Sequence, residues 1–420
     1  MGKQNRRRRT GRKPVPWPAL DAAAVAGDPA RIAEAVATAA LATAQGDKTS
    51  VRRFVDELAG PGSLTAEVAE GTARAGRRLI AHAFDAGWLP MDVHQAARRR
   101  VDEFALGYLT DLMAEHRAPF APDTVDEIWQ NQLDALAATV WWSPDRPHPG
   151  QWADRALLSG SEALDSIVAA LALLLQLPRL EPICPLPGTP ARPVAHEHVD
   201  DKTLGRVRGL LAKAESTSFA EEAEALSAKA QELMTNYAID RAILAHHTTG
   251  PPLPTARRLW LDTPYTDAKA LLVDQVTRAN RARAVFAADW GFVTIIGDDP
   301  DLDAVEILST SLLVQATRTM IDTPTPTPTA DSRTRAYRKA FLTAYATRIG
   351  ARLATATTTT VADSPDPTTL LPILTSHAHR VDQAVTTYFP TTHTRGITLR
   401  SAEGWHAGTE AADRAHLDQP

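Results

Sequence analysis

Cysteine is almost absent from this chain, which has a single thiol, Cys184, in 420 residues. One cysteine excludes a disulfide framework within the chain and a redox centre made of two thiols. The flanking sequence Pro-Ile-Cys-Pro favours a buried or linker thiol over a reactive one. A chain with so little cysteine is typical of a reducing compartment, so the sequence predicts a cytoplasmic protein.

Long apolar runs are also missing. The longest, residues 167–175, is much shorter than the roughly 20 residues that a membrane-spanning helix needs. No apolar segment of a signal peptide follows the basic first residues. We therefore expect no association with a membrane.

The sequence motifs of several enzyme classes are absent as well. There is no H-E-x-x-H helix, no Walker loop, no G-x-G-x-x-G after a strand, no G-x-S-x-G elbow and no H-x-E with P-C-x-x-C. These absences argue against zinc proteases, nucleotide-binding enzymes, α/β hydrolases and zinc deaminases, although a novel enzyme would escape them. We expect no cofactor and no metal site.

Charge is unevenly distributed along the chain. The net charge is −5, but residues 1–13 hold seven Lys/Arg and no acid, so the rest carries 38 bases against 50 acids, a net charge of −12. Arg6, Arg7, Arg8 and Arg9 would be attracted to nucleic acid or to another acidic surface. We expect residues 1–16 to form a disordered basic arm, and the alternative to binding nucleic acid is that this arm serves only solubility.

Periodicity and proline content divide the remainder into domains. We expect an Ala-rich all-helical domain at 17–180, a Pro-rich linker at 181–199, a helical hairpin at 200–245, a linker at 246–262 and an α+β domain at 263–420 with a Thr/Pro-rich insert at 322–332.

The same patterns predict the secondary structure within these domains. In the first domain we expect helices at 30–45, 49–58, 64–86, 91–116, 125–139 (capped by Asp123 or Thr124) and 161–177. In the last we expect strands at 284–288 and 292–296 joined by a three-residue loop, a helix from Asp299 to about residue 321, and helices at 267–278, 335–356, 370–389 and 401–417. The predicted fold class is mainly α with a small α+β C-terminal domain, in which a short antiparallel β-hairpin packs with several helices.

The helical hairpin is the segment that the sequence specifies best. Apolar residues recur at three- and four-residue steps in both of its helices, and Ser218 with Glu221 has capping-box spacing. Its sequences Leu-Leu-Ala-Lys-Ala-Glu-Ser-Thr (210–217) and Lys-Ala-Gln-Glu-Leu-Met (229–234) resemble the bacterial and phage family called domain of unknown function 2786. Residues of about 265–417 resemble domain of unknown function 7168, on the pieces at 291–297, 337–342 and 407–412. These resemblances imply no activity.

Histidines near carboxylates are the candidates for metal binding or catalysis. The His/Asp-rich segment at 196–201 lies in a linker that does not fix a ligand geometry. His377, His379 and Asp382 form an H-x-H-x-x-D pattern, but residues two apart on a helix point about 200° apart, so we expect a solvated helix face. His406 and Glu410, at i and i+4, are the best-placed His–carboxylate pair and the weak candidates for catalysis. Arg395, Glu403 and Arg400 are near them in sequence, but we expect a structural or solvated role for His406.

Clustered cations of the C-terminal region carry the leading hypothesis. The candidate phosphate contacts, besides the four arginines of the arm, are Arg278, Arg281, Arg283, Arg335, Arg338 and Lys339. The aromatic stripe Tyr337, Phe341 and Tyr345 favours a core over a stacking platform for bases. The sequence thus favours a non-catalytic protein that binds nucleic acid weakly and in a salt-dependent way. A protein–protein interaction module and a hydrolase of unassigned type in the C-terminal domain are the alternatives.

Overall fold

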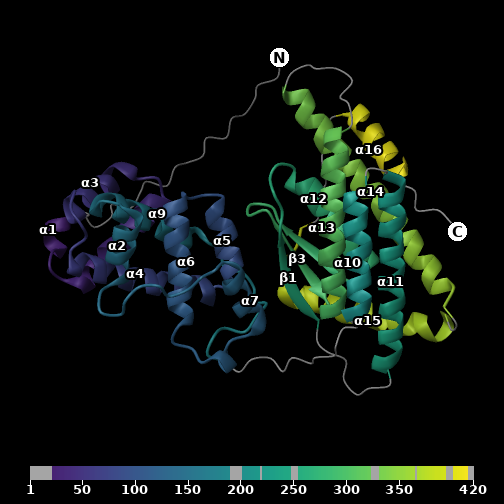
Figure 1. The fold of residues 1–420 in the computed structure, drawn as a ribbon, viewed down its shortest axis with the longest axis horizontal. Coiled ribbons are helices and arrows are strands. Elements are labelled where there is room, and N and C mark those ends of the chain that lie inside the picture. The colour runs from purple at the N-terminus through teal and green to yellow at the C-terminus, as the bar shows by residue number, and fades with distance from the viewer. Residues whose placement is uncertain are drawn as a thin grey trace, which may run out of the picture. The chain divides into compact units, whose positions relative to one another are not determined.

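The computed structural model describes residues 21–189, 201–217, 220–246, 254–322, 331–364, 367–393 and 401–414. The chain divides into two compact units, Met1–Arg192 and Pro193–Pro420. Figure 1 shows helices throughout the described part and a three-stranded antiparallel sheet in the second unit. The predicted fold class, mainly α with a small α+β C-terminal part, is confirmed.

The N-terminal unit is built of helices around the apolar helix α9. Helix α9 packs on α2, α3, α4 and α6. The side chains of Ser159 and Glu162 form a capping box at the start of this helix. Its elements are α1 (Ala22–Val25), α2 (Pro29–Ala44), α3 (Lys48–Ala59), α4 (Ala66–Asp85), α5 (Pro90–Arg98), α6 (Glu103–Arg117), η1 (Pro122–Thr124), α7 (Glu127–Ala135), α8 (His148–Ala156) and α9 (Gly160–Gln176). Among the described helices none is by itself long and apolar enough to cross a membrane; only α8 and α9 together, bent by 113°, meet that test by length and composition.

Three predictions for this unit need correction. The helix expected at 91–116 is two helices, because the Asp102 side chain accepts a hydrogen bond from the Ala105 N–H at 2.8 Å and caps a new helix, α6. The helix expected at 125–139 is the shorter α7, capped by Asp126, while Asp123 and Thr124 belong to η1. Helix α8 was not predicted.

The C-terminal unit places a sheet of order β1-β3-β2 among helices. Its elements are α10 (Asp201–Ser216), α11 (Ala220–His246), β1 (Thr255–Trp260), α12 (Thr266–Ala279), β2 (Arg283–Ala287), β3 (Phe292–Gly297), α13 (Asp299–Asp322), α14 (Asp331–Ala362), α15 (Pro367–Tyr388) and α16 (Ala402–Arg414). The central strand β3 is buried along its whole length, and α12, α13 and α15 pack against the sheet.

The sequence missed strand β1, which lies inside the predicted linker 246–262. It pairs with β3 from Thr255↔Gly297 to Trp260↔Phe292, so the predicted β-hairpin is in fact part of a three-stranded sheet. Only Ala256 of β1 is buried, as expected for an edge strand, and an edge strand leaves a weak periodic signal in the sequence. The loop between β2 and β3 spans residues 288–291 rather than the expected three residues.

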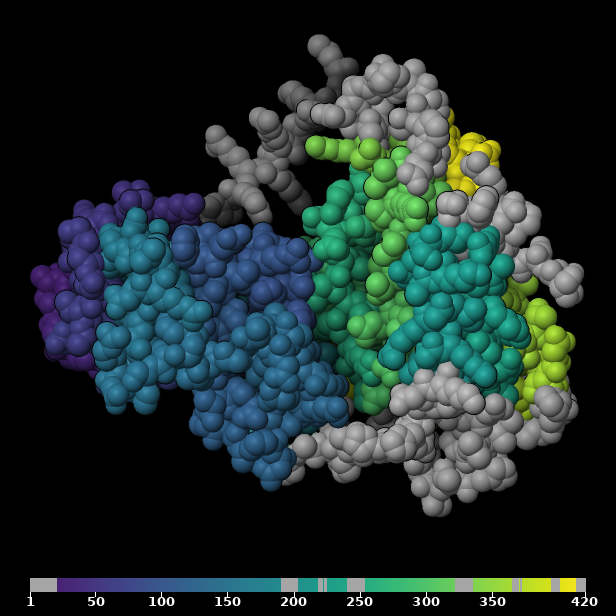
Figure 2. Space-filling view, in the orientation of Figure 1, coloured from purple at the N-terminus to yellow at the C-terminus, as the bar shows by residue number. Residues whose placement is uncertain are grey.

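The two helices of the predicted hairpin are present as α10 and α11, and they share one core with the rest of the C-terminal unit. Val207, Leu211 and Met234 belong to the same buried cluster as Val293 and Ile295 of the sheet. The hairpin, which the sequence predicts as a separate domain at 200–245, therefore lies in one compact unit with the α+β region. In Figure 2 the hairpin, in teal, covers green elements of that unit. Ser218 and the Glu221 side chain lie outside the described part.

Helix α16 lies unusually close to α14. A Cβ atom added at Gly404 or Gly408 would come within 3.0 Å of the backbone carbonyl oxygens of Tyr337 and Phe341, so two glycines four residues apart permit this approach. Tyr337, Phe341 and Tyr345 are all buried, with 6%, 0% and 3% exposed. The prediction that this aromatic stripe belongs to the core is confirmed.

Candidate functional site

A cluster of buried charged groups forms where strand β3 ends and helix α13 begins. Asp298 follows β3 directly, and its carbonyl oxygen accepts a hydrogen bond from the Leu302 N–H at 3.0 Å. Asp298 rather than the expected Asp299 thus precedes the helix. Asp301 lies in the first turn, so both carboxylates are near the N-terminus of α13, where unpaired N–H groups and the helix dipole stabilise negative charge. Both are buried, at 6% and 4% exposed.

The turn before strand β2 brings an arginine to these carboxylates. Because β2 runs antiparallel to β3, with Arg283 opposite Ile296, the residues before β2 lie at the same end of the sheet as those after β3. Arg281 has a left-handed backbone with φ of 59°, and its Nη2 lies 3.0 Å from Asp301 Oδ1. The Arg281 side chain is only 13% exposed, so its charge and that of Asp301 are buried as a pair.

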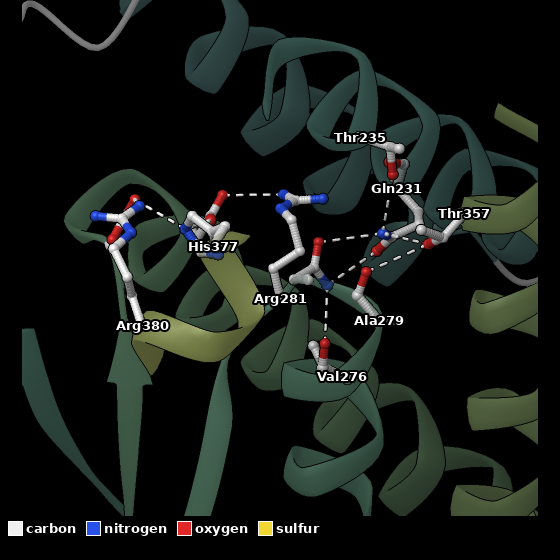
Figure 3. Close-up of polar contacts among 11 residues, drawn as sticks. Gln231, Thr235, Val276, Ala279, Arg281, Thr357, His377 and Arg380 are labelled. Atoms are coloured by element: carbon white, nitrogen blue, oxygen red, sulfur yellow. Dashed lines mark hydrogen bonds and ion pairs between the residues drawn. The ribbon is translucent and has the colours of Figure 1, made fainter. Parts of the chain in front are cut away.

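Helix α15 supplies a histidine and a second arginine (Figure 3). His377 Nε2 lies 2.8 Å from Asp298 Oδ2 and 3.8 Å from Asp301 Oδ2. Arg380, almost one helical turn later, approaches Asp298 Oδ2 to 3.7 Å. We call these five residues the Asp–His–Arg cluster.

The cluster corrects one prediction from the sequence. The H-x-H-x-x-D segment was expected to be a solvated helix face, yet His377 is only 8% exposed. His379 and Asp382 are exposed, as that prediction requires, and Asp382 pairs with Arg283. The pattern within the helix did not reveal the role of His377, because its carboxylate partner Asp298 is 79 residues away in the sequence.

A second buried polar network ties the hairpin to the turn that carries Arg281. The amide of Gln231, fully buried on α11, exchanges two hydrogen bonds with the Asn280 amide, at 3.1 and 3.2 Å. It also donates to the hydroxyls of Thr235 and Thr357, both at 3.3 Å. Helices α11 and α14 and the turn after α12 are thereby held together beside the cluster (Figure 3).

A small pocket borders the cluster. Its lining comes from the two hairpin helices, from the turn with Arg281 and from the start of α13: Thr203, Leu204, Val207, Met234, Tyr237, Asn280, Arg281, Pro300, Asp301 and Ala304. Its volume of about 10 Å³ is close to the least that one water molecule requires. Binding sites for organic ligands are far larger, at roughly 300–1,000 Å³. The pocket fits a water molecule beside an ion better than it fits an organic compound.

Four of the six predicted phosphate contacts in the C-terminal unit are paired with carboxylates. Arg278 lies 2.9 Å from Asp274, Arg283 lies 2.8 Å from Asp382, and Lys339 pairs with Asp267, in addition to the Arg281–Asp301 pair. By contrast, Arg335 and Arg338 are exposed near the start of α14. Within the described part of the chain, neither arginine forms an ion pair. Arg6, Arg7, Arg8 and Arg9 lie outside the described residues.

The weak catalytic candidates do not form an enclosed site. His406 and Glu410 are both exposed on α16. Burial, followed by the negative charges of Glu403 and Glu410, raises the pKa of Tyr337 on the neighbouring helix. Arg395, Arg400 and the segment 196–200 lie outside the described residues. Among the described residues of this unit, the buried histidine is His377, which the sequence did not favour.

The matched segment of a known family coincides with the hairpin. Residues 202–241 match the family described as "Protein of unknown function (DUF2786)". This match confirms the resemblance predicted for the hairpin. The DUF2786 segment supplies Gln231 to the amide network and five residues to the pocket wall. No curated protein and no solved structure matches the chain.

Proposed function

We propose that this protein is a non-catalytic binding protein that associates with nucleic acid through the phosphate backbone. The contacts would come from Arg6, Arg7, Arg8 and Arg9 of the basic arm and from Arg335 and Arg338 on α14. The observation that carries the proposal is the exposure of the last two, while four other candidate cations face carboxylates.

Phosphate binding needs cations that are accessible and not already neutralised. A cation held by a carboxylate must lose that partner or share it, which reduces its net gain from a phosphate. Arg335 and Arg338 are three residues apart, so they lie on one face of α14. Together with the four arginines of the arm they make six contacts on a chain whose remaining part is acidic. Binding would therefore be weak, dependent on salt and without base preference.

We also propose that residues of about 265–417 form a domain of the type called domain of unknown function 7168, and that the protein acts in the cytoplasm. The first rests on the sequence resemblance and the second on the near absence of cysteine. Neither adds an enzymatic activity.

The two alternatives have less support in the structure. An interaction module needs an open apolar groove, but apolar residues of the hairpin are buried in the core of its own unit. A hydrolase in the C-terminal unit would rest on His406 and Glu410, and both are exposed on α16. Among the described residues, no specific observation favours either alternative.

The test is binding of labelled single-stranded DNA, duplex DNA and RNA, measured by fluorescence polarisation at low salt. Variants in the full chain replace Arg6–Arg9 with serine, or carry Arg335→Glu with Arg338→Glu. The matched control, Arg52→Glu with Arg53→Glu on α3, makes the same change of charge at two exposed arginines elsewhere. We expect both test variants to weaken binding and the control to leave it near the wild-type value. Equal losses of affinity in the test and control variants would mean that only the net charge of the chain matters, which would contradict contacts by these arginines. No binding by the wild type below about 10 µM would refute the proposal.

A further inference from the structure

We propose that Asp298, Asp301 and His377 form a binding site for a divalent transition-metal ion. This inference is independent of nucleic-acid binding, and it goes against the expectation from sequence that the chain has no metal site. It rests on the convergence of one imidazole nitrogen and two carboxylate oxygens from three places in the chain: the end of β3, the first turn of α13, and α15.

The spacing of the donor atoms fits a metal ion. The three candidate ligand atoms all lie within 4.8 Å of one another, and His377 Nε2 is 2.8 and 3.8 Å from the two carboxylate oxygens. Ligands at about 2.0–2.2 Å from a tetrahedral zinc ion are roughly 3.3 Å apart. Small side-chain shifts would therefore bring the three atoms to bonding distance. All three side chains are at least nine-tenths buried, at 10%, 7% and 6% exposed, so the donors are held by packing.

Arg281 and Arg380 both contact the carboxylates of the proposed site. Arg281 pairs with Oδ1 of Asp301, and the other oxygen of that carboxylate faces His377. Arg380 is 27% exposed and 3.7 Å from Asp298, a long contact that a side chain at the rim can give up. In the metal-free protein these guanidinium groups offset two buried negative charges. With a metal bound they would repel it, so the site would have lower affinity than one with uncompensated carboxylates.

The chemistry of the site selects the type of ion. An imidazole nitrogen as ligand favours first-row transition metals over Mg²⁺ and Ca²⁺, which prefer oxygen ligands. Three protein ligands leave a fourth position, which zinc sites of this type fill with water. The adjacent pocket shares Asp301 and Arg281 with the cluster and has room for about one water molecule.

The experiment measures metal binding by the full chain after chelator treatment and dialysis. Zn²⁺ and Mg²⁺ are titrated calorimetrically, and Co²⁺ is followed by its visible absorption, which reports coordination directly. We expect one Zn²⁺ per chain in the wild type, and loss of that binding in His377→Asn. The matched control is His379→Asn, because this exposed histidine lies two residues further along the same helix. Equal Zn²⁺ binding by His377→Asn and His379→Asn, or no binding by the wild type below about 100 µM, would overturn the proposal.

A second variant keeps the test decisive if His377→Asn does not fold, as judged by circular dichroism. Arg380→Gln removes a repelling charge at the partly exposed rim, so Zn²⁺ should bind more tightly, on the order of tenfold. A purely structural ion-pair cluster would give no Zn²⁺ binding in wild type or variant. Unchanged affinity in Arg380→Gln would also contradict the site. Preference for Mg²⁺ over Zn²⁺ would refute the role of the imidazole.

Discussion

Replacing Gln231 with alanine should destabilise the C-terminal unit by about 3–5 kcal/mol. Four hydrogen bonds connect the Gln231 amide to Asn280, Thr235 and Thr357, but its two N–H groups face three acceptors, so about three bonds act at a time. Each contributes roughly 1 kcal/mol net, and a buried partner left unsatisfied costs about 1–3 kcal/mol. The cavity left by the fully buried side chain adds to this loss.

Two further variants separate these contributions. Gln231→Leu fills most of the volume but leaves the Asn280 amide without its partner, so it should cost less than Gln231→Ala by the cavity contribution. Asn280→Ala combined with Gln231→Ala should cost about 1–3 kcal/mol less than the sum of the two single changes, because both remove the same pair of bonds.

The assay is urea denaturation of the full chain, with hydrogen exchange of the α11 backbone to locate the effect. A loss below about 1 kcal/mol for Gln231→Ala, or additive effects of the two alanine changes, would refute the network as the link between hairpin and sheet. Faster exchange confined to α11 and the turn after α12 would support it.

Three other predictions concern packing, capping and pH. Gly408→Ala should destabilise the chain by about 1–3 kcal/mol in thermal denaturation, because the added Cβ would meet the backbone of Phe341. The control Gly209→Ala has open space around it and should be neutral or stabilising. Similar losses of stability in both variants would contradict the close packing of α14 and α16. Ser159→Ala should cost about 1 kcal/mol through loss of the capping box of α9, and an unchanged urea midpoint would argue against it. Burial lowers the pKa of His116 from 6.5, so the folded state favours the neutral imidazole and the unfolded state takes up a proton more readily. The contribution of His116 to the free energy of unfolding should therefore be constant above pH 6.5 and fall below it. His116→Gln should lessen that fall in urea titrations between pH 5 and 8, and an identical fall in the variant would exclude His116 as its cause.

Local signals in the sequence were sufficient for much of the helical architecture. Periodicity identified both helices of the hairpin and the buried aromatic stripe on α14. The division of 91–116 into two helices was also within reach, because Asp102 before Glu103 has the chemistry of a helix start. Strand β1 was harder to see, since Arg257 and Arg258 interrupt its apolar residues, and Arg257 is satisfied by acids of α13 that only the fold brings near.

The candidate site could not be assembled from the sequence. In the sequence, Asp298 and Asp301 are only two acids beside the helix start that we expected at Asp299, and His377 is one polar residue in an H-x-H-x-x-D pattern. Their relation depends on the antiparallel order of the sheet and on the packing of α15 against β3. Likewise, Gln231 is a polar residue in a helix until the structure places Asn280 opposite it. Long-range pairs of polar residues leave no periodic signal in either partner.

The measurement that tests the proposed function most directly is the dependence of duplex-DNA affinity on salt. With six phosphate contacts, log K should fall against log salt with a slope of about −5 for the wild type. Serine in place of Arg6–Arg9 should reduce the slope to about −2, and glutamate at positions 335 and 338 should reduce it by about 2. The Arg52→Glu/Arg53→Glu control should keep the wild-type slope. A slope near zero in the wild type, or one that none of these variants changes, would contradict binding through these arginines.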